Sequence, residues 1–417
     1  MTAPPRGRPH ILVVSHVAPF EAGAGQTRRV RYTVDALRPH FHVTFLTFAR
    51  RADAARIRAQ LDGVCDQLVV LPAVTDKTMA RARAGIARIT YPRATGLKQS
   101  NYVIGRLELT PERIASNVDP SAYDLVLFEY FHASEATRVF RDAGVPVALD
   151  LHNVMWRSLE QQLDASGASA PRAARRVARY RAAEERAWKR FDVLIAINEE
   201  EQREVERVVG PEPQVWYAPM GVPLDEWPMS WEPAQPPILG YYGGLGSHDR
   251  ERALFRTRRD LMPAIWATHP DVQLRIIGGR PSADARALAD DPRVHVTGWL
   301  DDVRPELAAL TALVCPWSGR FGFRSRLIET MAIGTPVVAT PDAVAGMGMP
   351  DGEGLLLATD DDGLVAHCLR LIEEPNAATA LSRRARATAE RFDFASTYGE
   401  LAARLLALAT TRMGRTD

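Results

Sequence analysis

Short apolar runs alternate with longer amphipathic segments along the whole chain. In the first half these runs consist mainly of β-branched residues and leucine, without regular apolar and polar alternation. Continuous runs of this kind are typical of strands buried on both faces, as in a parallel sheet covered by helices. Helical spacing at 26–40 and 154–191 predicts helices between strands, with a break at 167–171. The strands predicted in the first half span residues 10–15, 42–48, 67–73, 124–130, 146–151, 192–198 and 214–219.

The same pattern restarts after residues 221–237, a segment with five prolines and no periodic apolar face, which we interpret as a linker. Further strands are predicted at 238–244, 272–279, 293–299, 312–317, 335–340 and 354–359. The fold class is therefore α/β, with two Rossmann-like doubly wound parallel-sheet domains facing across a cleft. The predicted domains are 1–220 and 238–393, and 394–417 forms a final helix. Ligands of such folds bind at the carboxyl ends of the strands.

Composition narrows the class of protein. The 417 residues carry a net charge of +1, which argues against nucleic-acid binding. Cys65, Cys315 and Cys368 are far apart and form neither a zinc motif nor a disulfide framework, which suits a reducing cytoplasm. No apolar run reaches the roughly 20 residues of a membrane span, and the first run is too short for a signal peptide. We expect a cytoplasmic protein that at most contacts a membrane surface.

The strongest chemical signal follows the strand at 312–317. Gly322 gives the loop conformational freedom. Arg324, Arg326 and Glu329 follow it, around the start of a predicted helix. Arg326 and Glu329 are three residues apart and share one helix face, so a surface ion pair is the alternative. Guanidinium groups match phosphate oxygens, and a carboxylate matches a ribose diol. This stretch predicts a site for a nucleoside diphosphate.

A second candidate is the glycine-rich turn after the strand at 238–244. Gly244 and Gly246 would let the backbone approach a ligand, and the free N–H groups of the next helix would attract an anion. Arg250 lies one turn into that helix. Ordinary turn chemistry is the alternative explanation of these glycines.

Polar residues also follow strands of the first half. His16 ends the first strand and precedes a loop that contains Gly25, and His152 ends the strand at 146–151. Glu129 ends the strand at 124–130. Each could line a ligand site, or could be a structural group with its hydrogen bonds satisfied.

Two stretches are basic, 77–98 and 171–190. Arginines recur at helical intervals in the second, with Tyr180 and Trp188 between them. A solvated helix face is one interpretation, and a surface for anionic lipid or an anionic acceptor is the other.

At these residues the sequence resembles the GT-B-fold, retaining glycosyltransferases of the GT4 type, and is most similar to exopolysaccharide-type sugar transferases. Members of that subgroup carry G-x-R-x-K-x-x-E followed by A-M-A-x-G-x-P-V-V. Gly322, Arg324, Arg326 and Glu329 fall at that spacing, with arginine in place of lysine, and are followed by TMAIGTPVVAT. The resemblance extends over the chain and includes YAPMGV at 217–222 and RFDF at 391–394.

The resemblance implies roles for these residues. Glu329 would bind the donor ribose, and Arg326 with Arg250 would bind the diphosphate, with Arg324 assisting. His152 matches a histidine that lies beside the transferred sugar. The donor would be a UDP-, GDP- or TDP-sugar, with no other cofactor and no metal, and the acceptor a sugar, a lipid-linked molecule or a small molecule. The final helix would cross back onto the first domain.

Two positions depart from the family pattern. Phe321 occupies the place of the first glutamate of E-x7-E, and Gly244 the place of an arginine in the phosphate loop. These departures leave a non-catalytic binding subunit open as an alternative, and a nucleotide-sugar epimerase or hydrolase on the same fold is another. A dinucleotide oxidoreductase is disfavoured, because no strand is followed by a full G-x-G-x-x-G.

Overall fold

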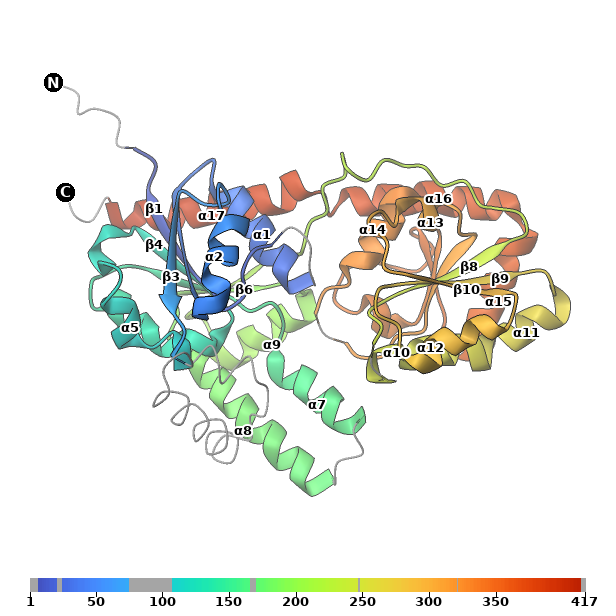
Figure 1. Cartoon of the computed structure of the whole chain (residues 1–417), viewed down its shortest axis with the longest axis horizontal. Helices are drawn as coiled ribbons and strands as arrows, with labels where there is room; N and C mark the ends of the chain where they lie inside the picture. Colours follow the sequence, from blue (N-terminus) through green and yellow to red (C-terminus); the bar gives the residue numbers. More distant parts are fainter. Residues whose placement is uncertain are drawn as a thin grey trace. The chain divides into compact units, whose positions relative to one another are not determined.

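The structure is a computed structural model that describes residues 7–20, 25–74, 107–165, 170–246, 248–320 and 322–413. The chain forms two compact units, Met1–Pro219 with Thr397–Asp417, and Met220–Ser396. Each unit contains a parallel β-sheet with helices packed on it, which confirms the predicted α/β class (Figure 1). The basic stretch 77–98 lies outside the described residues.

The first unit contains a seven-stranded parallel sheet in the order β3-β2-β1-β4-β5-β6-β7 among its described residues. These strands are β1 (His10–Val14), β2 (His42–Ala49), β3 (Gln67–Pro72), β4 (Leu125–Glu129), β5 (Val147–Asp150), β6 (Val193–Ala196) and β7 (Gln214–Tyr217). The seven strand predictions of the first half are confirmed. Strands β1 and β4 are neighbours, with Ile11 in register with Leu125.

The helices of the first unit are α1 (Gly25–Leu37), α2 (Arg51–Gln60), α5 (Pro111–Ala115), α6 (Thr137–Arg141), α7 (Met155–Ala165), α8 (Ala170–Trp188) and α9 (Glu199–Val209), with 3-10 turns η2 (Pro120–Ala122) and η3 (Phe131–Ala136). One apolar cluster joins the sheet to α5, α6, α7, α8 and α9. Helix α8 begins at Ala170, so Pro171 lies in its first turn and not in the predicted break. Proline is tolerated there because first-turn N–H groups have no partner inside the helix.

The second unit contains a six-stranded parallel sheet in the order β10-β9-β8-β11-β12-β13 among its described residues. These strands are β8 (Ile238–Tyr242), β9 (Gln273–Ile277), β10 (Val294–Gly298), β11 (Ala312–Cys315), β12 (Val337–Ala339) and β13 (Leu355–Leu357). The six strand predictions of the second half are confirmed.

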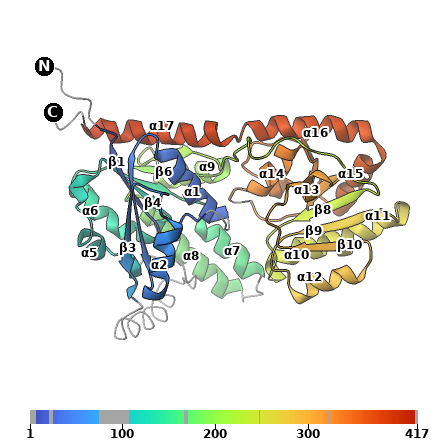
Figure 2. The same cartoon turned by 45° about the horizontal axis from the view of Figure 1, so that its top comes forward.

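Helices cover both faces of the second sheet. They are α10 (His248–Arg256), π-helical η4 (Thr257–Leu261), α11 (Met262–Thr268), α12 (Ala283–Ala287), η5 (Leu288–Asp290), α13 (Arg304–Ala308), α14 (Ser325–Ile333), η6 (Pro341–Val344), α15 (Asp361–Glu373) and α16 (Pro375–Glu390). Apolar residues of α13, α14 and α16 form one core cluster, and those of α10, α11, α12 and α15 form another. Figure 2 shows α10 and α12 on one side of the sheet and α13 and α14 on the other.

The proline-rich segment 221–237 is hydrogen-bonded to the second unit. The indole Nε1 of Trp231 donates to the Leu310 carbonyl at 2.7 Å, and the Ser230 and Trp231 amides donate to Ile333 at 3.0 Å. The last helix, α17 (Phe394–Met413), begins at the predicted residue, and residues 414–417 lie outside the described part of the chain. From Thr397 onward it belongs to the first unit, where Tyr398 packs edge-on against Tyr32. No described helix combines the length and apolar character needed to cross a membrane.

Candidate active site

The predicted nucleotide site lies where the strand order of the second sheet reverses. From β8 the chain adds β9 and β10 on one side, and then returns to place β11 on the other side. Tyr242 ends β8, and the loop after β11 leads into α14, which carries Arg326 and Glu329. Ligands of open α/β sheets bind at such a reversal, beyond the carboxyl ends of the strands.

Helix α14 is bounded by two glycines in the left-handed region. Gly322 has φ 71°, and Gly334, which ends the helix, has φ 93°. A side chain at Gly334 would also lie 2.9 Å from the hydroxyl of Ser382. These glycines allow a short helix to fit between two buried strands, which brings its first turn to the edge of the sheet.

Arg326 and Glu329 both contact Tyr242, and these three residues are called the Arg326 cluster below. The Arg326 guanidinium lies 5.2 Å from the centre of the Tyr242 ring. The Tyr242 hydroxyl donates to Oε2 of Glu329 at 3.0 Å, and Glu329 is only 1% exposed. The shared helix face is confirmed, and the alternative of an exposed ion pair is wrong because Glu329 is buried.

Arg324 lies apart from the Arg326 cluster. Its Nη2 donates to the Gly319 carbonyl at 3.1 Å, and its guanidinium lies 5.5 Å from the Trp317 ring. Burial lowers the pKa of Arg324. In this structure Arg324 stabilises the loop after β11.

A buried carboxylate organises the glycine-rich turn after β8. Glu251, fully buried in α10, accepts hydrogen bonds from the Gly246 amide at 2.8 Å and from the Ser282 amide and hydroxyl at 2.9 and 2.5 Å. Gly246 has φ 103°, and a side chain there would lie 2.8 Å from the Arg280 carbonyl. The loops after β8 and β9 are thus held together, with Gly244 half-buried in the first of them. The side chain of Arg250 lies outside the described part of α10.

The first sheet also reverses its order, between β1 and β4, and the predicted polar residues follow the neighbouring strands. His16 follows β1, Glu129 ends β4, and His152 follows β5. Gly25 is the first residue of α1, rather than part of the loop before it.

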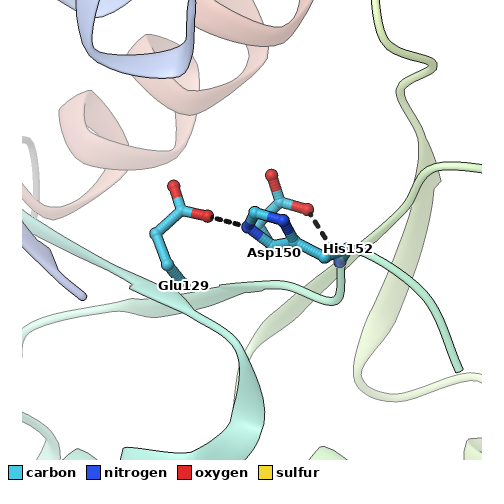
Figure 3. Close-up of side chains that lie close together, drawn as sticks. All are labelled: Glu129, Asp150 and His152. Atoms are coloured by element: carbon cyan, nitrogen blue, oxygen red, sulfur yellow. Dashed lines mark hydrogen bonds and ion pairs between the residues drawn. The ribbon is translucent and has the colours of Figure 1, made fainter. Parts of the chain in front are cut away.

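Three of these side chains form a buried group, the His152 cluster, which consists of Glu129, Asp150 and His152 (Figure 3). Nε2 of His152 lies 2.5 Å from Oε2 of Glu129, and the His152 amide donates to Oδ1 of Asp150 at 3.3 Å. Burial, and next the charge of Asp150, raise the pKa of Glu129.

Asp150 is paired with a cation from another helix. Nε of Arg29, in α1, donates to Oδ2 of Asp150 at 2.7 Å, and Nη2 of Arg29 donates to the Ala218 carbonyl at 3.2 Å. Burial alone would lower the pKa of Arg29, but the charge of Asp150 raises it overall. The three side chains of the His152 cluster are close enough to surround a metal ion. The guanidinium of Arg29, paired with Asp150, disfavours a second cation there, and Nε2 of His152 is already in contact with Glu129. Both contacts would have to break before a metal ion could bind.

Aromatic rings surround the His152 cluster. The Tyr130 ring stacks on His152, with centroids 4.0 Å apart, and the His132 ring lies between 4.8 and 5.5 Å from those of His16 and Tyr130. Burial, and next His152, lower the pKa of His16 to about 3, and burial holds the pKa of His132 well below its usual range. Both histidines are therefore neutral at physiological pH.

Helix α8 combines an exposed basic side with a buried carboxylate. Its exposed arginines are Arg172, Arg175, Arg179, Arg181 and Arg186. Tyr180 and Trp188 belong to the core instead, so their predicted place on the basic surface is wrong. Glu184 accepts hydrogen bonds from the Met155 and Trp156 amides at 2.8 and 2.9 Å, and so fixes the start of α7 close to His152.

Both halves of the chain match known families. Residues 24–221 match the Glycosyl transferase 4-like domain, and residues 236–374 match Glycosyl transferases group 1. The chain is 29% identical over 201 residues to a phosphatidyl-myo-inositol mannosyltransferase of Propionibacterium freudenreichii, an alignment covering 46% of this chain and 48% of the relative. The chain thus spans about half the length of the curated relatives it matches.

Solved structures share the fold over nearly the whole chain. Sucrose-phosphate synthase from Thermosynechococcus elongatus has a TM-score of 0.64 at 22% identity, covering 96% of this chain and 100% of that one. Anabaena HepE in complex with UDP-glucose has a TM-score of 0.62 at 16% identity, with the same coverage. The chain belongs to the GT4-type glycosyltransferases of the GT-B fold.

Proposed function

We propose that this protein transfers a sugar from a nucleoside diphosphate donor to an acceptor hydroxyl, with retention of anomeric configuration. The observation that supports this most directly is the Arg326 cluster, in which a cation and a carboxylate converge on Tyr242 at the strand reversal of the second sheet. A nucleoside diphosphate needs both charges, a cation for its phosphates and a carboxylate for its ribose.

In this proposal Glu329 accepts hydrogen bonds from the ribose hydroxyls, and Tyr242 fixes the orientation of its carboxylate. Arg326 stabilises the negative charge that develops on the diphosphate as the sugar leaves, with Arg250 and the backbone at Gly244 assisting, while Gly246 shapes the turn through its hydrogen bond to Glu251. Interactions that strengthen as charge develops accelerate the reaction as well as binding the donor. Because guanidinium groups supply the positive charge, we propose that no metal ion is required.

The first unit would contribute His152 beside the transferred sugar, while the leaving phosphate accepts the proton of the acceptor hydroxyl. The exposed arginines of α8 would attract an anionic or lipid-linked acceptor, since clustered surface arginines favour anionic surfaces. The protein would then work in the cytoplasm, at the inner face of a membrane. A lipid acceptor also agrees with the name of the mannosyltransferase relative.

A donor panel tests the proposed function. UDP-, GDP- and TDP-sugars are incubated with and without candidate acceptors, and release of nucleoside diphosphate and the anomeric configuration of the product are followed by NMR. We expect one nucleotide class to give acceptor-dependent release with retention. Epimerised or free sugar without an acceptor would instead support the epimerase or hydrolase. Arg326→Ala should abolish turnover, whereas Arg320→Ala, on the loop that precedes α14 and half exposed, should not.

A further inference from the structure

Arg280, in the loop after β9, has a backbone conformation that arginine rarely adopts. Its φ is 59°, in the left-handed region that is unfavourable for residues other than glycine. Among the non-glycine residues that the structure describes, Tyr130 and His152 are the others with positive φ, and they follow β4 and β5 of the first unit. Strained backbone of this kind clusters at ligand sites, so its presence at Arg280 indicates a functional role.

Neighbouring loops hold Arg280 in this conformation from two sides. A side chain at Gly246, in the turn after β8, would lie 2.8 Å from the Arg280 carbonyl. A side chain at Gly279 would lie 2.7 Å from the ring of Trp299, which follows β10. Glu251 joins the loops after β8 and β9 through hydrogen bonds from their backbone amides, at 2.8 and 2.9 Å. The loop after β9 is therefore fixed between its neighbours, which is the condition under which a strained residue persists.

This packing brings the side chain of Arg280 to the proposed diphosphate site. Its Cβ lies 3.9 Å from the position that a side chain would take at Gly246, so it begins directly beside the glycine-rich turn. Strands β8 and β9 are parallel neighbours, with Tyr242 in register with Ile277, and both loops leave the carboxyl edge of the sheet. Ligands of open parallel sheets bind at that edge.

The charge of Arg280 is not neutralised within the described part of the chain. Arg280 is exposed, and no hydrogen bond or ion pair joins its side chain to another described residue. The arginines before and after it are engaged, because Arg275 pairs with Glu306 and Arg286 donates to the Pro281 carbonyl at 2.7 Å. A guanidinium on a strained backbone without an acidic partner is available to an external anion.

The charges around the turn after β8 favour a further cation there. Gly244 contributes no side chain to the turn, and the fully buried carboxylate of Glu251 is hydrogen-bonded to it. A negative charge so close to the turn opposes a diphosphate, and the repulsion is stronger where water is excluded. A guanidinium beside the turn offsets that charge and binds phosphate oxygens through paired N–H groups.

We propose, building on the transferase function above, that Arg280 binds the diphosphate of the donor from the loop after β9, in addition to Arg326 from α14. The fold then tolerates an unfavourable backbone conformation because that conformation places a cation at the ligand site. Glycine adopts the same conformation without strain. Glycine at position 280 therefore removes the ligand contact and leaves the loop intact.

Arg280→Gly is the variant that separates binding from folding. The Tm of the ligand-free variant should be equal to or above that of the wild type, since the strain is removed. Calorimetric titration with the preferred nucleoside diphosphate should give an affinity about tenfold lower. Arg280→Lys, which keeps the charge but loses the paired N–H groups, should lose about threefold. Arg384→Ala, at an exposed position of α16, changes the net charge equally and should bind like the wild type.

The corresponding nucleoside, which lacks the phosphates, tests the nature of the contact. In NMR titrations its affinity should be the same for the wild type and Arg280→Gly. A loss as large as that of the diphosphate would overturn the proposal, and so would an Arg280→Gly variant that binds the diphosphate normally or has a Tm several degrees below the wild type. These results would leave the transferase function standing. Diphosphate binding that depends on Arg280 in a protein without transfer activity would refute the function alone, and a wild type that binds none of UDP, GDP and TDP would refute both.

Discussion

The hydroxyl of Tyr242 donates a 3.0 Å hydrogen bond to the buried carboxylate of Glu329, and so connects the end of β8 to α14. The two strands that lead to these residues, β8 and β11, are neighbours at the reversal of strand order. The same Tyr242 ring contacts the Arg326 guanidinium. One aromatic side chain thus orients both charged groups that the proposed donor requires.

Removing the Tyr242 hydroxyl should weaken nucleotide binding without disrupting the fold. In Tyr242→Phe the ring under Arg326 remains, while Glu329 loses the donor that orients it. We expect affinity for the preferred nucleoside diphosphate to fall by about five- to tenfold, the net value of one typical hydrogen bond. Titration calorimetry measures this directly. Tyr242→Leu also removes the cation–π contact, so its affinity for the nucleotide should fall further. Equal losses of affinity in the two variants would show that the ring does not orient Arg326.

Breaking the buried ion pair of the first unit should destabilise the protein strongly. Asp150→Asn leaves the guanidinium of Arg29 buried without its partner at 2.7 Å. We expect a loss of about 3–5 kcal/mol in the free energy of unfolding of the first unit, measured by urea denaturation. Asp35→Asn, which removes the partly exposed pair with Arg31, should cost only about 0.5 kcal/mol. Similar losses of unfolding free energy in the two variants would contradict the claim that the buried Arg29–Asp150 pair stabilises the first unit.

Acid should destabilise the first unit through histidines that are held neutral in the fold. His16 in the folded protein binds a proton only near a pKa of about 3, whereas the unfolded chain binds one near 6.5. Since the unfolded state binds more protons between these values, stability should fall as pH decreases from 6.5 towards 3. The slope is at most about 1.4 kcal/mol per pH unit for each such histidine. His16→Gln should reduce this slope, measured by urea denaturation at several pH values, and His40→Gln, at an exposed position, should leave it unchanged.

Chelation separates the proposed mechanism from a metal-dependent one. If guanidinium groups alone stabilise the leaving diphosphate, excess EDTA should leave kcat unchanged, and added Mg²⁺ or Mn²⁺ should not raise it. A rate that falls on chelation and recovers with one divalent ion would contradict the metal-free proposal.

The strands could be predicted from the sequence because each is buried on both faces. Runs such as ILVV at 11–14 and ALVC at 312–315 contain no polar residue, and a run of that kind has few alternatives to a central parallel strand. The starts of α14 and α17 also followed from local signals, Gly322 before the first and helical spacing in the second. Pro171 was more ambiguous, because the same residue can end one helix or lie in the first turn of the next.

The site was only partly accessible to sequence reasoning. Arg326 and Glu329 share one helical turn, so their spacing was informative. The Arg29–Asp150 pair joins residues 121 positions apart, and no local pattern relates them. The role of Tyr242 was missed for the same reason, since its partners lie on α14, more than 80 positions away. Glu251 was missed because it joins the nearby Gly246 to the distant Ser282. The pair Tyr241 and Tyr242 at the end of β8 was the one available hint. A hydroxyl at the carboxyl end of a parallel strand lies where ligands of this fold bind.

Calorimetric titration of UDP, GDP and TDP into the wild type, Arg326→Ala and Arg320→Ala tests the central claim most directly. The account predicts that one nucleotide binds the wild type, that Arg320→Ala binds it equally well, and that Arg326→Ala binds it at least about tenfold more weakly. Equal affinity of the wild type and Arg326→Ala would contradict the assignment of this cluster to the donor diphosphate.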